Sequence, residues 1–355
     1  MAPLLVTLAL ALAGAGLAHG AGLPLPWLSG PLLVTAGAAI GGLRVLGAAP
    51  TFPVNLRFVL VPVIGVAIGG QVGAVGWEQA ATWLVTLSAL ALYLPVAMAM
   101  SYAIYRRAGG YPRVTAFYAA MPGGLIEAVA MGEKAGADVP TLTLLQFARL
   151  ILCILMVPLA IAAYEGRAVG SAAGLALGTD PAALTLSDVA VLVGAALVGY
   201  LGGRRIGLPA ALITGPLIVS AAVHLAGMTD ADPPGFVVAL TQYVVGTALG
   251  VRFVDMARGE ALRGLGWAAL SVGAALLLAL GLALLLAPVI GPGAGADVEA
   301  VVLAFAPGGV TEMSLVALSL EIGVVFVSAH HVARILITVS MVGPIHAWLR
   351  RHRGW

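Results

Sequence analysis

Two short stretches of the sequence place a proline, two glycines and a carboxylate in the same spacing. One is Pro122-Gly123-Gly124 followed by Glu127, and the other is Pro307-Gly308-Gly309 followed by Glu312. Proline suits the first turn of a helix and glycine lets the backbone turn, so each stretch predicts a half-helix that begins at the break. Such a tip exposes unpaired N–H groups and the positive end of the helix dipole, which together attract anions.

An arginine follows each break at the same distance, Arg149 in the first case and Arg334 in the second. A charged side chain at the centre of a bilayer costs roughly 2.5–3.5 kcal/mol on insertion scales, so these residues are functional candidates. In the functional interpretation, the arginines and the helix tips bind an anionic substrate, while Glu127 and Glu312 bind a proton or a cation. In the alternative, each glutamate pairs with an arginine as a buried structural clamp, because an opposite charge lowers the burial cost.

His330 and His331 precede Arg334 and could titrate or donate hydrogen bonds in the substrate cavity. Histidines more commonly form a polar face on a packed helix, without a functional role. The two histidines are poor metal co-ligands, because adjacent helical residues point about 100° apart. The sequence contains no better cluster of histidine and carboxylate ligands. We therefore expect no metal, no cofactor and no enzymatic activity.

The composition places these residues in an all-α polytopic membrane protein. Of 355 residues, 61% are hydrophobic and 9% are charged, whereas soluble proteins are roughly a quarter charged. The net charge of +2 comes from scattered arginines, so a nucleic-acid partner is not expected. The expected partners are the lipid bilayer and a small-molecule substrate, and the sequence is compatible with a homo-oligomer.

The breaks belong to a longer internal duplication, which also matches Ala148-Arg149 with Ala333-Arg334 and Gly30-Pro31 with Gly215-Pro216. It predicts a first membrane repeat over 1–164, a linker over 165–185 and a second repeat over 186–355. The apolar first segment has no basic residues before it, so we expect a retained helix and not a signal peptide. The predicted helices cover 3–18, 31–48, 56–74, 79–105, 141–163, 186–201, 208–226, 236–254, 263–289 and 326–348, with broken elements at 114–133 and 299–320.

Loop charges predict that the two repeats are inverted. Basic residues concentrate on the cytoplasmic side of membrane proteins, which puts the loop of Arg106 and Arg107 inside and the corresponding loop of Asp297 outside. Inversion requires an odd number of crossings in each repeat. Each repeat has six predicted elements, five helices and one broken element, so one of the six must not cross. We therefore expect five crossings per repeat, with each broken element entering and leaving from one side, and both termini in the cytoplasm.

The duplicated Pro-Gly-Gly, Glu and Ala-Arg pattern resembles the AbrB-type duplicated bacterial membrane proteins, often labelled putative ammonia monooxygenase or AbrB family regulator. The resemblance implies a multi-pass inner-membrane protein similar to inverted-repeat carriers, without a fixed substrate. Together with the broken elements, it favours a secondary transporter that moves a small organic anion or amino acid by alternating access, with ion or proton coupling left open. The alternatives are a passive channel and a membrane regulatory or enzymatic subunit that affects gene expression indirectly.

Overall fold

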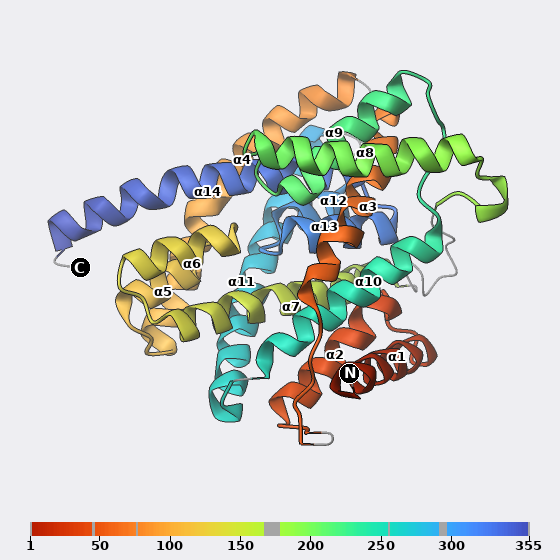
Figure 1. Ribbon diagram of the computed structural model, residues 1–355. Coiled ribbons are helices and arrows are strands. Elements are labelled where there is room, and N and C mark those ends of the chain that lie inside the picture. Colours follow the sequence, from red (N-terminus) through yellow and green to blue (C-terminus); the bar gives the residue numbers. More distant parts are fainter. Residues whose placement is uncertain are drawn as a thin grey trace. The chain divides into compact units, whose positions relative to one another are not determined.

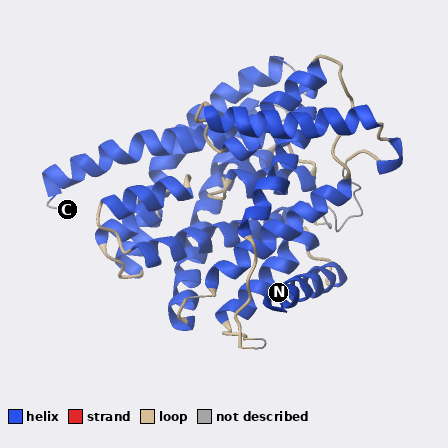
Figure 2. Ribbon diagram, viewed as in Figure 1, coloured by secondary structure: helices blue, strands red, loops and turns tan. Residues whose placement is uncertain are grey.

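The computed structural model describes residues 2–44, 47–75, 77–166, 178–254, 256–290 and 297–353, so most of the expected linker, at 167–177, lies outside the described residues. Within these ranges every regular element is helical (Figure 2). Seven of the described helices are long and apolar enough to cross a membrane. The expected fold class, an all-α polytopic membrane protein, is confirmed.

The α-helices follow the order expected from the sequence (Figure 1). They are α1 Ala2–Gly20, α2 Pro26–Ile40, α3 Arg57–Gly70, α4 Trp77–Ala103, α5 Arg113–Ala119, α6 Leu125–Lys134, α7 Val139–Glu165, α8 Leu186–Arg205, α9 Ala211–Leu225, α10 Gly235–Gly250, α11 Arg258–Ile290, α12 Val298–Phe305, α13 Val310–Leu320 and α14 Val324–Arg353. Each broken element consists of two short helices, α5 with α6 and α12 with α13. The number of crossings stays a prediction, because α2, α3 and α9 are shorter than the seven long helices.

One helix begins earlier than the sequence suggested. The Gly30-Pro31 pair was expected to start a helix at residue 31, but α2 begins at Pro26, after Leu25 in the left-handed conformation at φ 55°. Gly30 has a packing role, because a Cβ there would collide with the carbonyl oxygen of Gly14 in α1. Gly215 in α9 meets the carbonyl oxygen of Gly199 in α8 in the same way. These glycines let the helices approach closely, which is common in membranes.

The chain forms two compact units, and each takes segments from both sequence halves. The first unit comprises Met1–Trp77, Pro158–Arg258 and Val310–Val325, in which α1 packs on α2, α2 on α10, and α3 on α9. The second comprises Glu78–Val157, Gly259–Gly309 and Phe326–Trp355. It therefore holds both Pro-Gly-Gly stretches and the parts of α7 and α14 that carry Arg149 and Arg334. The repeat boundaries at 164 and 186 stay a prediction.

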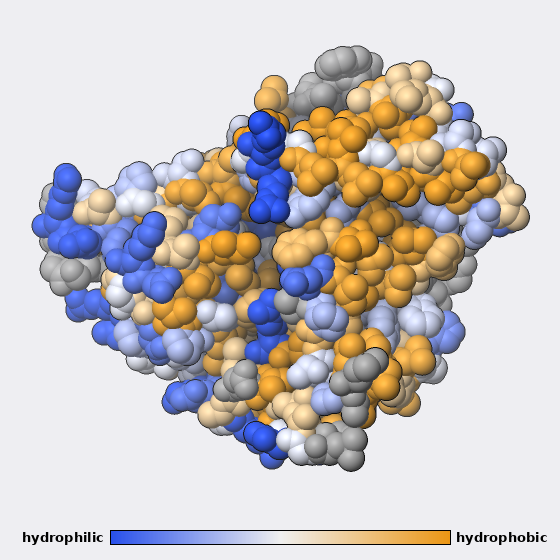
Figure 3. All heavy atoms as spheres, viewed as in Figure 1, coloured by the Kyte–Doolittle hydropathy of each residue, from blue (hydrophilic) through white to orange (hydrophobic). Residues whose placement is uncertain are grey.

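The outer surface is apolar in the way that a bilayer requires. Large hydrophobic side chains point outward along α8, where Leu186 is 87% exposed and Val198 is 62% exposed. In Figure 3 most of the visible face of this helix is hydrophobic, with hydrophilic atoms at the end nearer the centre of the view. A soluble protein would not leave so continuous an apolar face in water. The protein is therefore embedded in a lipid bilayer.

Candidate substrate site at the two helix breaks

The first break lies between α5 and α6. The helix α5 ends at Ala119, and α6 begins at Leu125, after Gly124 in the left-handed conformation at φ 67°. Glycine adopts this conformation without steric cost, which explains the second glycine of the stretch. The half-helix α6 therefore begins directly after the Pro-Gly-Gly stretch, as expected, and its first residue lies three positions beyond Pro122. In the second break, α12 ends at Phe305 and α13 begins at Val310, so Pro307 also precedes the helix.

Two side chains of α7 cap the end of α5. Arg149 Nη1 donates a hydrogen bond to the carbonyl oxygen of Met121. Gln146 Nε2, one turn earlier on the same helix face, donates to the carbonyl oxygen of Tyr118 at 2.8 Å. The last carbonyl groups of a helix have no partner within it, and at a buried break no water replaces one. Arg149 and Gln146 therefore satisfy the broken backbone.

The second break is capped from α14 in the same manner. Arg334 donates through Nη1 to the carbonyl oxygen of Ala306 and through Nη2 to that of Gly308. His331 Nε2 lies 3.1 Å from the carbonyl oxygen of Leu303. His331 and Arg334 are spaced like Gln146 and Arg149, three residues apart, so each pair lies on one helix face. Each break is thus capped by two side chains, three residues apart, on the helix that follows it.

Both arginines are buried cations, and no counter-charge pairs with them among the residues that the structure describes. Arg149 is 4% exposed and Arg334 is 1% exposed. Neither forms an ion pair within the described part of the chain. The Nε atoms of both, together with Gln146 Oε1 and His331 Nδ1, are buried and lack a hydrogen-bond partner. Buried donors are usually satisfied, so these groups mark a place where a ligand would gain hydrogen bonds.

Gly123 of the first break lies close to Arg334, the arginine that caps the second break. A Cβ built on Gly123 would lie 3.2 Å from Arg334 Nε. Arg149 and Arg334 are also close enough for their charges to interact. Residues that are far apart in the sequence therefore gather at one place within the second unit, beside the unpartnered Nε of Arg334.

The glutamates occupy a different position from the one that a clamp would require. Glu127 is the third residue of α6 and Glu312 is the third residue of α13, where a carboxylate interacts favourably with the helix dipole. The side chain of Glu127 folds back towards the start of its own helix, where its Oε2 would lie 2.8 Å from a Cβ added to Gly124. Glu312 is 6% exposed and belongs to the first unit. The pairing of Glu127 with Arg149, which the alternative interpretation required, is not found in the described residues.

His330 is a packed core residue. Its Nε2 lies 2.8 Å from Thr86 Oγ1, and its Nδ1 lies 2.8 Å from the carbonyl oxygen of Phe326. The ring also packs against Phe326, with ring centroids 4.0 Å apart. Both ring nitrogens are therefore occupied, whereas His331 faces the break. Gln146 was absent from the residues expected at the site, and its position three residues before Arg149 is the signal that could have found it.

The fold, the apolar exterior and the buried arginines at broken helices define a polytopic membrane protein. The chain belongs to the AbrB family, described as "Transition state regulatory protein AbrB", whose family model matches residues 36–350. It is also 25% identical over 359 residues to "Uncharacterized protein YhjN" of Bacillus subtilis (strain 168), an alignment that covers 98% of this chain and 93% of the relative. No solved structure matches the chain.

Proposed function

We propose that the protein is a secondary transporter that moves a small organic anion or an amino acid across the cytoplasmic membrane by alternating access. It carries its substrate without converting it chemically and without a cofactor. The observation that supports this proposal is the pair of buried arginines at the breaks, each with an unpartnered Nε and no ion pair in the described part of the chain.

A carboxylate is the group that fits these donors best. An isolated buried charge is strongly unfavourable, and an anion bound beside it offsets that cost. Guanidinium groups form charge-assisted hydrogen bonds with carboxylates that are roughly twice as strong as neutral ones. Because the Nη atoms of Arg334 already hold the backbone of the break, the substrate is bound through Nε. Loss of this substrate leaves the arginines in place, since the carbonyl groups still hold them.

The broken helices favour a carrier over a fixed binding site. Discontinuous helices at the interface of inverted repeats form the substrate sites of many secondary transporters. In our proposal each broken element is re-entrant, both termini lie in the cytoplasm, and the two repeats have opposite orientations. Glu127 and Glu312, near the starts of α6 and α13, are the proposed sites for a coupling proton or cation.

The orientation can be tested with cysteine labelling. Cys153 is fully buried, so the native protein gives little background. Cysteines introduced at Arg107 and Arg205 should resist an impermeant thiol reagent added outside, while cysteines at Glu78 and Asp230 should react. Labelling of the 106–113 loop and of the loop around Asp297 from the same side would contradict the inversion.

The transport proposal is tested with purified protein. A thermal-shift screen of small monocarboxylates, dicarboxylates and amino acids should identify a stabilising ligand, because ligands that bind the folded state raise its stability. That compound should then enter proteoliposomes, and an imposed ion or proton gradient should drive its accumulation above equilibrium. Uptake that only equilibrates under every gradient would favour a passive channel. No uptake of any stabilising compound would refute transport.

A further inference from the structure

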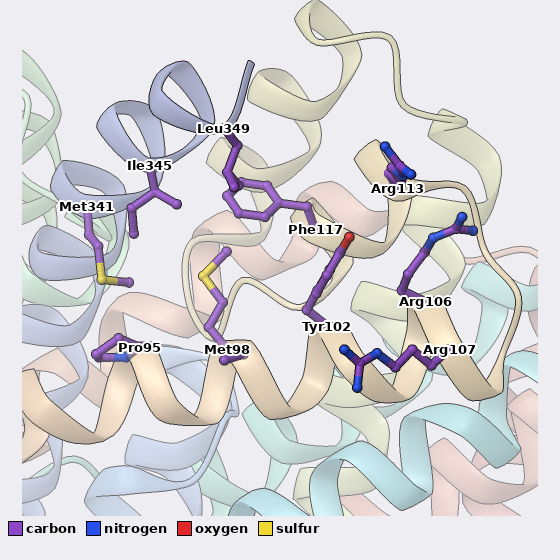
Figure 4. Close-up of a pocket in the computed structure, with 11 residues that line it drawn as sticks. Pro95, Met98, Tyr102, Arg106, Arg107, Arg113, Phe117, Met341, Ile345 and Leu349 are labelled. Atoms are coloured by element: carbon purple, nitrogen blue, oxygen red, sulfur yellow. The ribbon is translucent and has the colours of Figure 1, made fainter. Parts of the chain in front are cut away.

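A cavity separate from the helix breaks combines an apolar groove with a group of arginines. It has a volume of about 630 Å³ and is bounded by α4, α5 and α14, all in the second unit. Arg106, Arg107 and Arg113 line one side of it, and Figure 4 shows Pro95 and Met341 on the opposite side. None of these residues contributes to the proposed substrate site.

The apolar part of the cavity runs along two helices. On α4 the lining residues Pro95, Met98 and Tyr102 recur every three or four positions, so they share one face. On α14 the lining residues Met341, Ile345 and Leu349 recur every four positions. From Pro95 to Arg106 the helix rises roughly 16 Å. This length is close to one leaflet of a bilayer, which is about half of the 30 Å hydrocarbon core.

The charged part lies where these helices leave the membrane. The span that includes α4 ends at Ala108, and the span formed by α14 ends at Arg351. Arg106 and Arg107 belong to a π-helical turn, Ile104–Ala108 (η3), that follows α4. Trp348, which is 51% exposed on α14, is of the kind enriched at the membrane surface. The cavity therefore extends from the interface into the apolar layer.

No acidic residue in the described part of the chain pairs with these arginines. Within the described residues none of the three forms an ion pair, and the one hydrogen bond among them joins Arg106 Nη1 to the carbonyl oxygen of Tyr111 at 3.0 Å. Arg107 and Arg113 are exposed. Three cations at the mouth of an apolar groove are complementary to a molecule with an anionic head and a hydrocarbon tail.

We propose that this cavity binds an anionic phospholipid of the surrounding bilayer. The phosphate headgroup is held by Arg106, Arg107 and Arg113, and one acyl chain lies in the groove between α4 and α14. Basic pockets between membrane helices on the cytoplasmic side recognise anionic lipid headgroups in this way. The groove distinguishes a lipid from free phosphate, which would use the arginines alone.

The test uses the full chain, purified in detergent and offered equal amounts of dioleoyl phosphatidylglycerol and dioleoyl phosphatidylcholine. Native mass spectrometry should show that the wild-type protein retains more phosphatidylglycerol than phosphatidylcholine. The double variant Arg107→Gln/Arg113→Gln should weaken that binding by about 25-fold, at about one tenfold step per 1.4 kcal/mol and about 1 kcal/mol for each arginine. The matched control Arg204→Gln/Arg205→Gln removes two exposed arginines from the end of α8 and should leave binding unchanged.

The groove is tested separately from the arginines. Ile345→Trp fills the apolar part of the cavity and should reduce phosphatidylglycerol binding while the arginines are intact. Equal retention of both lipids by the wild-type protein would overturn the proposal, and that measurement needs no variant. Displacement of the lipid by an equal concentration of inorganic phosphate, an unchanged affinity in Ile345→Trp, or an equal loss in the control pair would overturn it as well.

Discussion

A single methyl group added at Gly123 should impair substrate binding without disturbing the fold. The Cβ of Gly123→Ala would lie 3.2 Å from Arg334 Nε, and 3.7 Å and 3.8 Å from its Cγ and Cδ. Gly123 is not among the glycines with positive φ, so alanine fits its backbone conformation. The methyl group needs only a shift of a few tenths of an ångström in a side chain, and it then covers the unpartnered N–H of Arg334.

The size of the effect follows from the bond that is lost. A hydrogen bond to a charged group contributes about 1.5–3 kcal/mol, which corresponds to roughly 10- to 150-fold in affinity. The KM for uptake into proteoliposomes, measured with the compound found by the thermal-shift screen, should therefore rise by at least tenfold. The amount of reconstituted protein and its melting temperature without ligand should stay close to the wild-type values.

The matched control is Gly266→Ala in α11, in the same unit, where a Cβ meets nothing within 4 Å. It should leave the KM unchanged. A wild-type KM in Gly123→Ala, at normal protein levels, would refute the role of Arg334 Nε in substrate binding. A similar rise in KM in both variants would show that the effect comes from the added alanine and not from its position.

Three further predictions concern the break, the packing of the first unit and a buried carboxyl group. Arg334→Lys should lower transport at least tenfold, because lysine keeps the charge but has no Nε–H group to donate to the substrate. Wild-type kinetics at normal protein yield would contradict this. Gly14→Ala should lower the melting temperature, because the added methyl group overpacks against α2 at a cost of about 1–3 kcal/mol. The control Gly16→Ala, whose Cβ meets nothing within 4 Å, should leave the melting temperature unchanged. The same melting temperature in both variants would contradict the close contact. In the loop after α9, burial raises the pKa of the Asp232 carboxyl, and the nearby His224 opposes part of this rise. The contribution of Asp232 to the stability of the fold is therefore fully present below about pH 3.9, the usual pKa of a free aspartate. It is lost as the pH rises through the raised pKa of the folded state. Asp232→Asn should therefore melt at a higher temperature than the wild type near neutral pH and show no such gain in acid, and a gain of the same size at both pH values would exclude this cause.

The sequence alone determined the class of the protein and the order of its helices. Composition and the length of apolar runs are local properties, and a bilayer permits few structures besides helices. The positions of the two breaks could also be predicted, because proline and glycine act on the backbone where they stand. The start of α2 was predicted wrongly. Gly30 and Pro31 lie inside α2, where Gly30 packs against Gly14 of α1, and no pattern within α2 identifies that partner.

The sequence could name Arg149 and Arg334 but not their partners. From the residues, each arginine was expected to bind an anionic substrate or, in the alternative, to pair with a glutamate, whereas in the structure both donate hydrogen bonds to backbone carbonyl groups. Carbonyl groups occur at every residue, so the sequence does not indicate which of them a broken helix leaves unsatisfied.

Only the tertiary structure decided which distant segments meet. Gly123 lies beside Arg334 because α14 packs against the first break, and the arginine-lined cavity exists because α4 and α14 leave a groove between them. These contacts depend on how side chains of separate helices fit together, and many packings satisfy the same apolar pattern. Helix formation is set by neighbours along the chain, but a binding site is set by neighbours in space.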